Sequence, residues 1–124
     1  MFRCAHHADV DSTNLEASRR VVAGAIAGPD DPPLLISADR QTAGRGRGGR
    51  AWRSPTGGLW LSIAWPLRGD AERYSPLPLV AGLALAEAVE RGTGVACRLK
   101  WPNDLLIDQR KLAGLLCAME LGGR

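Results

Sequence analysis

Apolar residues recur at helical spacing in two stretches of the chain, residues 11–28 and 75–94. In the first stretch Thr13 is followed three residues later by Glu16, which predicts a capping box at the start of a helix. Glycines mark the expected helix ends, at Gly28 with Pro29 and at Gly92. The residues expected to face the core are Leu15, Val22, Ala25 and Ile26 in the first helix and Leu79, Val80 and Leu83 in the second.

Five shorter apolar stretches predict strands, over residues 34–39, 59–65, 95–101, 104–108 and 110–121. The second alternates, with Leu59, Leu61, Ile63 and Trp65 on one side and Trp60, Ser62 and Ala64 on the other. The last two are joined through Asp108, Gln109 and Arg110, which indicates a hairpin. Residues 1–10 are expected to be a lead-in without an element. This order predicts a single α+β domain with a mixed, mostly antiparallel sheet flanked by helices.

Composition narrows the class of protein. The chain has 124 residues, 45% of them hydrophobic, and a formal net charge of +3. It contains no apolar run of the roughly 18 residues that a membrane helix needs and no signal-peptide pattern, so no membrane partner is expected. Its three widely spaced cysteines predict free thiols in a reducing cytoplasm, and they lack the short paired spacings of a zinc site with His6 and His7.

Positive charge and glycine concentrate in one segment, residues 39–58, which holds five arginines and six glycines. The segment GRGRGGR, residues 44–50, is called the glycine–arginine loop below. Its glycines match a dinucleotide-binding pattern, but the residues that follow it predict a strand where that fold needs a helix. A P-loop is excluded because no Gly-Lys-Ser/Thr closes the motif.

Two interpretations of the glycine–arginine loop remain open. Arginine and glycine beside an aromatic residue can grip nucleic acid, although such segments usually repeat and this one occurs once. The alternative is a clamp that stays mobile until an anionic ligand binds, because arginine forks bind phosphate and carboxylate while glycines allow close backbone approach. The clamp accounts for both the charge and the glycines.

A second informative segment, KWPNDLLIDQRKLAG, covers residues 100–114. Pro102 is expected to fix a turn that presents Asn103 and Asp104, and Lys111 stands across the expected hairpin from them. An Asn–Asp pair can orient a ribose, a base edge or hydrated Mg²⁺, while a lysine can neutralise phosphate or carboxylate. From this segment alone, ordinary turn chemistry with a surface lysine is an equally good interpretation.

Three segments in this order, DSTN (11–14), DRQTAGRGRGGRAWRSPTGGLWLS (39–62) and residues 100–114, closely resemble the catalytic domain of biotin–protein ligases. The similarity runs from about residue 11 to 121 and implies a fold like that of class II synthetases. It implies that biotin and MgATP form biotinyl-5′-AMP and pyrophosphate. Biotin is then transferred to a lysine on the biotin carboxyl carrier domain of acetyl-CoA carboxylase or a related carboxylase.

The resemblance also implies roles for individual residues. Arg47 and Lys111 are the expected catalytic residues, and Asp104 is the expected metal ligand. The expected biotin contacts are Ser12, Thr13, Asn14, Gln41, Gly44, Arg45, Gly46, Arg47, Lys111 and Gly114. The expected ATP contacts are Arg47, Arg50, Trp52, Asn103, Asp104 and Lys111, with the Trp52 indole available to stack on adenine.

The chain departs from the family pattern in extent. Further strands and a helix that follow residue 121 in the family, its C-terminal β-barrel and the N-terminal helix-turn-helix of its regulatory members have no counterpart here, which argues against DNA binding. The chain is therefore expected to be a partial ligase domain, or a product that pairs its open strand edge with a second copy as a homodimer. A lipoate-type ligase and a non-catalytic module for biotin, carrier or nucleic acid are the alternatives.

Overall fold

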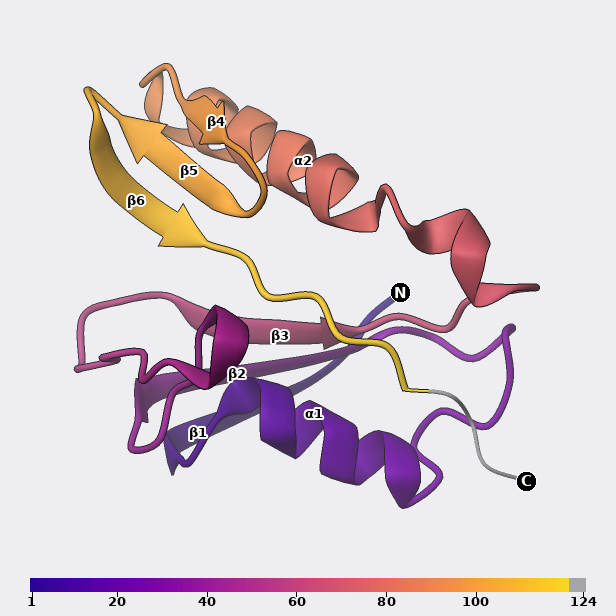
Figure 1. Ribbon diagram of the computed structural model, residues 1–124. Coiled ribbons are helices and arrows are strands. Elements are labelled where there is room, and N and C mark those ends of the chain that lie inside the picture. Colours follow the sequence, from indigo (N-terminus) through magenta and orange to yellow (C-terminus); the bar gives the residue numbers. More distant parts are fainter. Residues whose placement is uncertain (121–124) are drawn as a thin grey trace. The chain divides into compact units, whose positions relative to one another are not determined.

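The computed structural model describes residues 1–120 of the chain (Figure 1). They form two compact units, unit 1 comprising residues 1–68 with Glu120 and unit 2 comprising residues 69–119. The elements of unit 1 are β1 (Arg3–Val10), α1 (Thr13–Val22), β2 (Leu34–Gln41), a 3-10 turn (Arg47–Gly49) and β3 (Trp60–Ala64). Those of unit 2 are a 3-10 turn (Ala71–Tyr74), α2 (Leu77–Thr93), β4 (Arg98–Lys100), β5 (Asp104–Ile107) and β6 (Arg110–Gly114).

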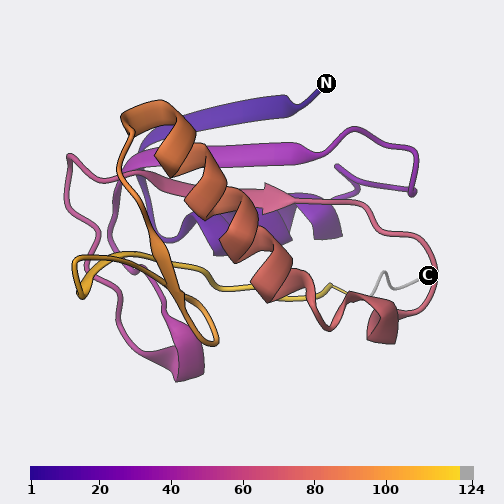
Figure 2. The same ribbon diagram turned by 90° about the horizontal axis from the view of Figure 1, so that it is seen from above.

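Unit 1 is a three-stranded sheet with α1 along one face (Figures 1 and 2). The sheet order is β1-β2-β3, with β1 parallel to β2 and β3 antiparallel to it. Leu34, Ile36 and Ala38 alternate along β2 and are buried, and Ala17 of α1 packs against the first two of them. Burial of these side chains fixes which face of the sheet meets the helix.

The prediction that residues 1–10 form no element is wrong, because Arg3–Val10 is strand β1. Its sequence, RCAHHADV, has no apolar alternation, and its only half-buried positions are Ala5, His7 and Val10. The strand forms because β2 supplies a pairing partner from Arg3↔Leu34 to Val10↔Gln41. That partner lies about thirty residues away, so local sequence does not reveal it.

The start and end of α1 differ from the prediction. Ser12, and not Thr13, is the N-cap: its backbone is extended and its Oγ accepts a hydrogen bond from the Leu15 N–H at 3.4 Å. The helix ends at Val22, whose side chain is 79% exposed, and the left-handed Gly24 follows. Gly28 and Pro29 therefore do not end it. Of the expected inward residues, Ala25 and Ile26 do pack against the core, although they lie beyond the helix.

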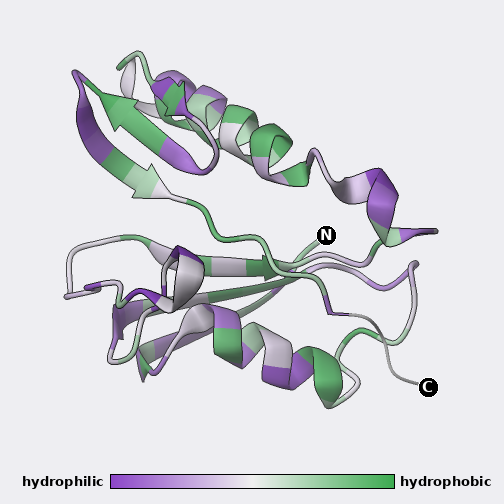
Figure 3. Cartoon of the chain, viewed as in Figure 1, coloured by the Kyte–Doolittle hydropathy of each residue, from purple (hydrophilic) through white to green (hydrophobic). Residues whose placement is uncertain are grey.

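Unit 2 is an antiparallel sheet, β4-β5-β6, with α2 packed against β4 and β5. Leu105 is fully buried, and a Cβ on Gly82 would lie 2.9 Å from Leu99 Cδ2, so helix and sheet touch closely there. The residues expected to face inward, Leu79, Val80 and Leu83, are instead 42%, 56% and 61% exposed. The prediction was wrong because apolar residues surround this helix, as its mostly green and white colouring shows (Figure 3).

The ends of the elements in unit 2 also differ from the prediction. The left-handed Gly94, not Gly92, caps α2. The β5–β6 hairpin is confirmed, and its turn residues Asp108 and Gln109 both have positive φ, 47° and 63°. β6 ends at Gly114; residues 115–120 are not a strand, and residue 121 lies outside the described residues.

The α+β class is confirmed, and three of the four strand pairings are antiparallel. The strands form two sheets in place of the single sheet expected. Among residues 1–120, neither helix has the length and apolar character needed to cross a membrane.

Candidate functional site

The start of α1 places three of the expected biotin contacts at the end of the sheet. Ser12 and Thr13 are 2% and 4% exposed, and Asn14 is half-buried. Ser12 is the extended N-cap residue, so Thr13 and Asn14 directly after it form the start of the first helical turn. The site therefore begins at the buried N-terminus of α1.

Charged side chains fix this helix terminus. Arg19 binds both Asp11 oxygens, at 2.8 and 2.9 Å, and the Ser12 N–H donates to Asp11 at 2.7 Å. The Arg19 hydrogen bonds, then that of Ser12, lower the pKa of Asp11 to about 2. Hydrogen bonds from Arg20, then Arg19, lower the pKa of Glu16. Both carboxylates are thus held in their charged form in the segment that carries Ser12 and Thr13.

The structure brings Thr13 and Gln41 together. Gln41 Oε1 accepts hydrogen bonds from the Thr13 backbone N–H at 2.8 Å and from Thr13 Oγ1 at 3.1 Å. Gln41 is the last residue of β2, so strand β2 and helix α1 deliver the two side chains to the same point. These two expected biotin contacts are in direct contact with each other.

Two further polar residues continue this contact, and sequence reasoning gave them no role. Ser54 Oγ accepts from Gln41 Nε2 at 2.8 Å, and Ser62 Oγ lies 2.9 Å from Thr13 Oγ1. Ser54 is 3% exposed. Ser62 stands between half-buried Trp60 and Ala64 on one side of β3. A serine among inward-facing strand residues was the signal that could have identified it.

The neck of the glycine–arginine loop is closed by backbone pairing. Gln41 bridges to Ser54 and Arg45 to Ala51, and the Trp52 N–H donates to the Gly44 carbonyl at 2.8 Å. A Cβ on Gly44 would lie 2.5 Å from the Trp52 carbonyl oxygen. Position 44 therefore requires glycine because the two sides of the neck touch there.

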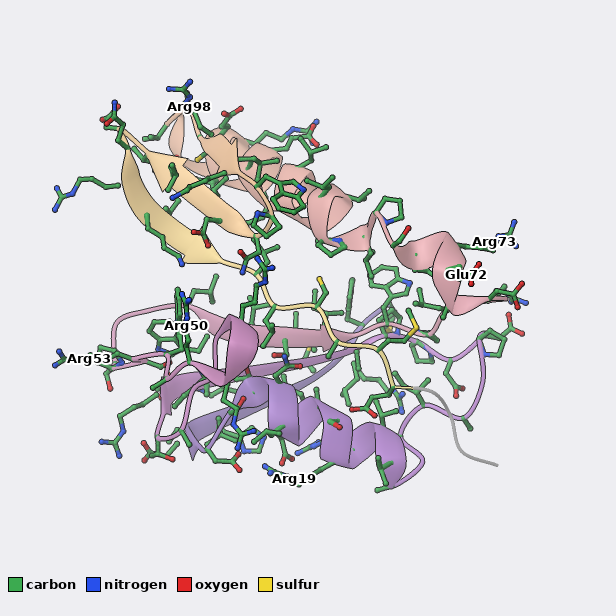
Figure 4. The ribbon with its side chains drawn as sticks, in the orientation of Figure 1. Arg19, Arg50, Arg53, Glu72, Arg73 and Arg98 are labelled. Carbon is green, nitrogen blue, oxygen red and sulfur yellow. The ribbon has the colours of Figure 1, made fainter. Side chains whose placement is uncertain are left out.

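The tip of the loop turns through residues 47–49. Gly48 and Gly49 have φ of 69° and 74°, the left-handed region that favours glycine. The side chains of Arg45, Arg47, Arg50 and Arg53 are exposed, and none forms an ion pair with residues 1–120. Figure 4 labels the Arg50 and Arg53 side chains beside the glycine–arginine loop. Within residues 1–120 these four charges therefore have no counter-ion.

Trp52 follows the loop and is half-buried. A Cβ on Gly46 would lie 3.5 Å from Trp52 Cε3, so the indole lies against the loop backbone. A Cβ at position 46 would make only ordinary van der Waals contact with the ring, so this approach does not require glycine. The stacking of adenine on Trp52 stays a prediction.

The expected site residues of unit 2 lie at the β4–β5 turn and across the hairpin. Lys111 Nζ is 2.9 Å from Asp104 Oδ1, with the two side chains 42% and 22% exposed. Asn103 Nδ2 donates to the Leu115 carbonyl at 3.1 Å, and the Leu115 N–H returns a 2.8 Å bond to Asn103. Gly114 pairs with Asp104 in the strand register. All four expected residues of this unit are thus neighbours.

The expected site residues fall into one group on each unit. Asn103 and Asp104 line a shallow hollow of unit 2 together with Gly82, Leu99, Lys100 and Trp101. The remaining expected residues, from Ser12 to Trp52, belong to unit 1. The joint action of the two groups on one ligand stays a prediction.

Comparison with known proteins gives the context for this arrangement. The sequence pattern of the Biotin/lipoate A/B protein ligase family matches residues 27–124. The chain is 40% identical over 111 residues to the biotin–[acetyl-CoA-carboxylase] ligase of Paracoccus denitrificans, covering 88% of this chain and 44% of that protein. It therefore spans less than half the length of that relative.

Two solved structures share the fold. The biotin protein ligase from Aquifex aeolicus, in complex with biotin and ATP, matches with a TM-score of 0.74 and 34% identity over 94% of this chain and 47% of that one. The ligase from Leishmania major, in complex with biotinyl-5-AMP, matches with a TM-score of 0.77 and 31% identity over 92% and 51%. On the extent of the family match and these likenesses, the chain belongs to the biotin/lipoate A/B protein ligase family.

Proposed function

We propose that this protein is an ATP-dependent biotin–protein ligase. Biotin and ATP give biotinyl-5′-AMP, and the activated acyl group then passes to a lysine of a carrier protein. The observation that carries the proposal is a loop with exposed arginines that have no ion-pair partner among residues 1–120, anchored beside the Thr13–Gln41 pair. The likeness of the chain to ligases solved in complex with biotin and ATP or with biotinyl-5-AMP supports it.

The proposed biotin site combines hydrogen-bonding groups with the loop. Its residues are Ser12, Thr13, Asn14, Gln41, Gly44, Arg45, Gly46, Arg47, Lys111 and Gly114. Thr13 and Gln41 are held by their mutual hydrogen bonds, which lowers the entropy cost of ordering them around a ligand. The loop glycines let the backbone approach the acyl-phosphate closely.

The first step joins two anions, so charge neutralisation is the main task of the protein. A biotin carboxylate oxygen attacks the α-phosphorus of ATP, the bond between that phosphorus and the bridging oxygen breaks, and pyrophosphate leaves. We propose that Arg47 and Lys111 offset the repulsion between the carboxylate and the phosphate. Positioning and charge stabilisation are most of what such a transfer requires.

The proposed nucleotide contacts are Arg47, Arg50, Trp52, Asn103, Asp104 and Lys111. Among residues 1–120 no group of three or more metal-ligating side chains is present. A single carboxylate such as Asp104, with the Asn103 side-chain oxygen, still fits Mg²⁺, because this ion keeps several waters and takes further oxygens from phosphate. Bound there, Mg²⁺ would supply positive charge to the phosphates.

The proposed acceptor is the biotin carboxyl carrier domain of a carboxylase. In the second step its lysine amine attacks the acyl carbon, and AMP leaves as the acyl–phosphate bond breaks. We propose a cytoplasmic location, which agrees with three cysteines that are free in the structure. A homodimer in which an open strand edge pairs with a second copy of the chain is also proposed.

Two measurements on the purified chain test the function. Calorimetry should show biotin binding that tightens when ATP and Mg²⁺ are present, and a carrier domain should gain biotin only with ATP. A carrier domain with its target lysine changed to arginine is the control. Biotin binding without ATP-dependent labelling would indicate a non-catalytic biotin-binding module instead.

A lipoate-type ligase is the second candidate, because the matched family includes lipoate ligases. Lipoic acid added as a competitor should leave biotin labelling unchanged. Transfer of lipoate to its own carrier domain would favour the second candidate. RNA binding with a steep salt dependence and no biotin affinity would favour a nucleic-acid module.

A further inference from the structure

We infer that Ser54 and Ser62 are positioning residues that fix the orientation of the Gln41 amide, so that Gln41 meets its ligand as a hydrogen-bond donor. This inference rests on the proposed function, in which Gln41 contacts biotin. Neither serine is placed against the ligand: each acts through a neighbouring residue. A continuous chain of hydrogen bonds inside unit 1 runs from β3 through α1 and β2 to the neck of the glycine–arginine loop.

The chain of hydrogen bonds has four links. Ser62 Oγ lies 2.9 Å from Thr13 Oγ1, which lies 3.1 Å from Gln41 Oε1. Gln41 Nε2 lies 2.8 Å from Ser54 Oγ, and Ser54 Oγ lies 3.1 Å from the Trp52 carbonyl oxygen. Four different segments of the sequence thus meet through side chains that are buried or half-buried.

The chemistry of the two fixed groups sets the direction of every link. The Trp52 carbonyl can only accept, so the Ser54 hydroxyl donates to it and accepts from Gln41 Nε2. The Thr13 backbone N–H can only donate, so the atom facing it at 2.8 Å must be the Gln41 oxygen. Thr13 Oγ1 then donates to that oxygen and accepts from Ser62.

This direction leaves one bonding position on the Gln41 amide. Both lone pairs of Oε1 are taken by Thr13, and one Nε2 hydrogen is taken by Ser54. The second Nε2 hydrogen has no partner among the described residues, and it is the group that we infer Gln41 offers to a ligand. A ligand group at this place must accept a hydrogen bond, as the carbonyl of the biotin ring does.

Ser54 also connects the amide to the loop. Its backbone carbonyl accepts from the Gln41 N–H at 3.0 Å, and a Cβ on Gly44 would lie 2.6 Å from its Oγ. The hydroxyl therefore sits where both sides of the loop neck meet. A residue in this place can hold the ligand-binding amide and the start of the loop in one arrangement.

The ligand-free protein allows a direct test. The chain contains only two glutamines, Gln41 and Gln109, and two asparagines, so its side-chain amide NMR signals are few. We expect the Gln41 side-chain hydrogens to exchange with solvent more slowly than those of Gln109, which lies in the exposed hairpin turn. Ser54→Ala should speed the Gln41 exchange about tenfold, the effect of losing one buried hydrogen bond.

Two further variants, Ser62→Ala and Ser37→Ala, complete the exchange experiment. Ser62→Ala should give a smaller increase, because it removes a link that reaches Gln41 only through Thr13. Ser37→Ala makes the same chemical change in β2, where the hydroxyl contacts His6, and should change nothing at Gln41. Circular dichroism shows whether each variant is folded. If Ser54→Ala does not fold, the exchange rate in Ser62→Ala is the test. Gln41 exchange unaltered in both folded variants would overturn the inference.

A binding measurement tests the consequence for the ligand. The probes are biotin and 2-iminobiotin, in which the ring carbonyl oxygen is replaced by an imino group that donates when protonated. Wild-type protein should bind biotin more tightly than 2-iminobiotin. Ser54→Ala should weaken biotin binding about tenfold and narrow this difference, whereas Ser37→Ala should leave both affinities unchanged. An unaltered difference between the two ligands in folded Ser54→Ala would overturn the positioning role.

The two experiments separate the inference from the proposed function. If wild-type protein lacks biotin affinity while Gln41 responds to Ser54→Ala, the function is wrong and so is the assigned ligand, but the hydrogen-bond chain stands. If wild-type protein binds biotin while Gln41 ignores both serine variants, the function stands and the inference is wrong.

Discussion

The glycine–arginine loop of unit 1 and the β5–β6 hairpin of unit 2 both carry cations proposed to act in catalysis, and they hold them differently. Arg45 and Arg47 have no ion-pair partner among residues 1–120, whereas Lys111 lies 2.9 Å from Asp104. An anion that reaches the loop displaces only water, but an anion that reaches Lys111 must compete with a carboxylate. The loop is therefore suited to capturing anions, and Lys111 is suited to acting once Asp104 is engaged by another cation.

The largest expected effects come from removing one cation from the loop or one from the hairpin. Arg47→Ala or Lys111→Ala should each slow adenylate formation by two or more orders of magnitude, about 3 kcal/mol, on the scale of a lost electrostatic contact in a transition state. Pyrophosphate release at saturating biotin and ATP is the measurement.

Each of these variants has a matched control. Arg53→Ala removes an exposed arginine just beyond the loop, and Arg110→Ala removes the residue beside Lys111. Both should stay within about twofold of wild type, as surface charges do. Near-normal rates for Arg47→Ala and Lys111→Ala would remove these residues from the proposed mechanism.

The next expected effect tests the anchoring of the loop. Gly44→Ala places a Cβ 2.5 Å from the Trp52 carbonyl oxygen, so the neck must shift, at a cost of about 2 kcal/mol of folding stability. Biotin affinity should fall as well, because the neck adjoins Gln41. Gly28→Ala is the control, since a Cβ there would meet nothing within 4 Å. Denaturant unfolding of both variants measures the difference, and equal midpoints would contradict the close contact at position 44.

A smaller effect is expected on the hairpin side. Asp104→Asn removes the partner of Lys111 and the carboxylate proposed for Mg²⁺. Stability should change by less than about 1 kcal/mol, because Lys111 is 42% exposed and such pairs contribute little. The Mg²⁺ concentration for half-maximal adenylate formation should rise about tenfold. Mn²⁺ binding, followed by its effect on water relaxation, gives a second readout, and unchanged metal affinity would exclude Asp104 as a ligand.

Local sequence predicted the hairpin better than it predicted the sheet, and the roles given to the candidate site residues stay predictions. Asp108 and Gln109 lie directly between the two strands that they join, so the turn depends on nearby residues alone. Strand β1 depends on β2, and Ser54 gained its role only when the loop neck brought it to Gln41. Such partners are distant in sequence and leave no local periodic signal.

The helix errors have a different origin. Ser12 and Thr13 are both good capping residues one position apart, so the pattern alone did not separate them. In α2 the apolar residues surround the helix, so no single face stood out. Only the packing of Gly82 against Leu99 shows which side meets the sheet. The glycine–arginine loop was conspicuous in the sequence because its arginines and glycines cluster within a few positions, and the roles proposed for them stay predictions.

The smallest expected effect concerns the start of α1. There Arg19 forms an ion pair with Asp11, as Lys111 does with Asp104 in the hairpin and unlike the arginines of the loop. Arg19, then Ser12, lowers the pKa of Asp11 from 3.8 to about 2. The folded-state value lies below the unfolded one, so the stabilisation is complete above about pH 4 and is lost as the pH falls towards 2. Asp11 is 41% exposed, so solvent screening limits the contribution to about 0.5–1 kcal/mol.

Asp11→Asn should therefore lower the free energy of unfolding at pH 7 by about that amount and leave it unchanged near pH 2. Urea unfolding of both proteins between pH 7 and pH 2 measures this, with Asp70→Asn as the control because Asp70 is exposed and forms no ion pair with residues 1–120. A difference that persists to pH 2 would show that Asp11 acts through its shape and not its charge. The Asp11–Arg19 ion pair would then contribute little to the stability of the helix start.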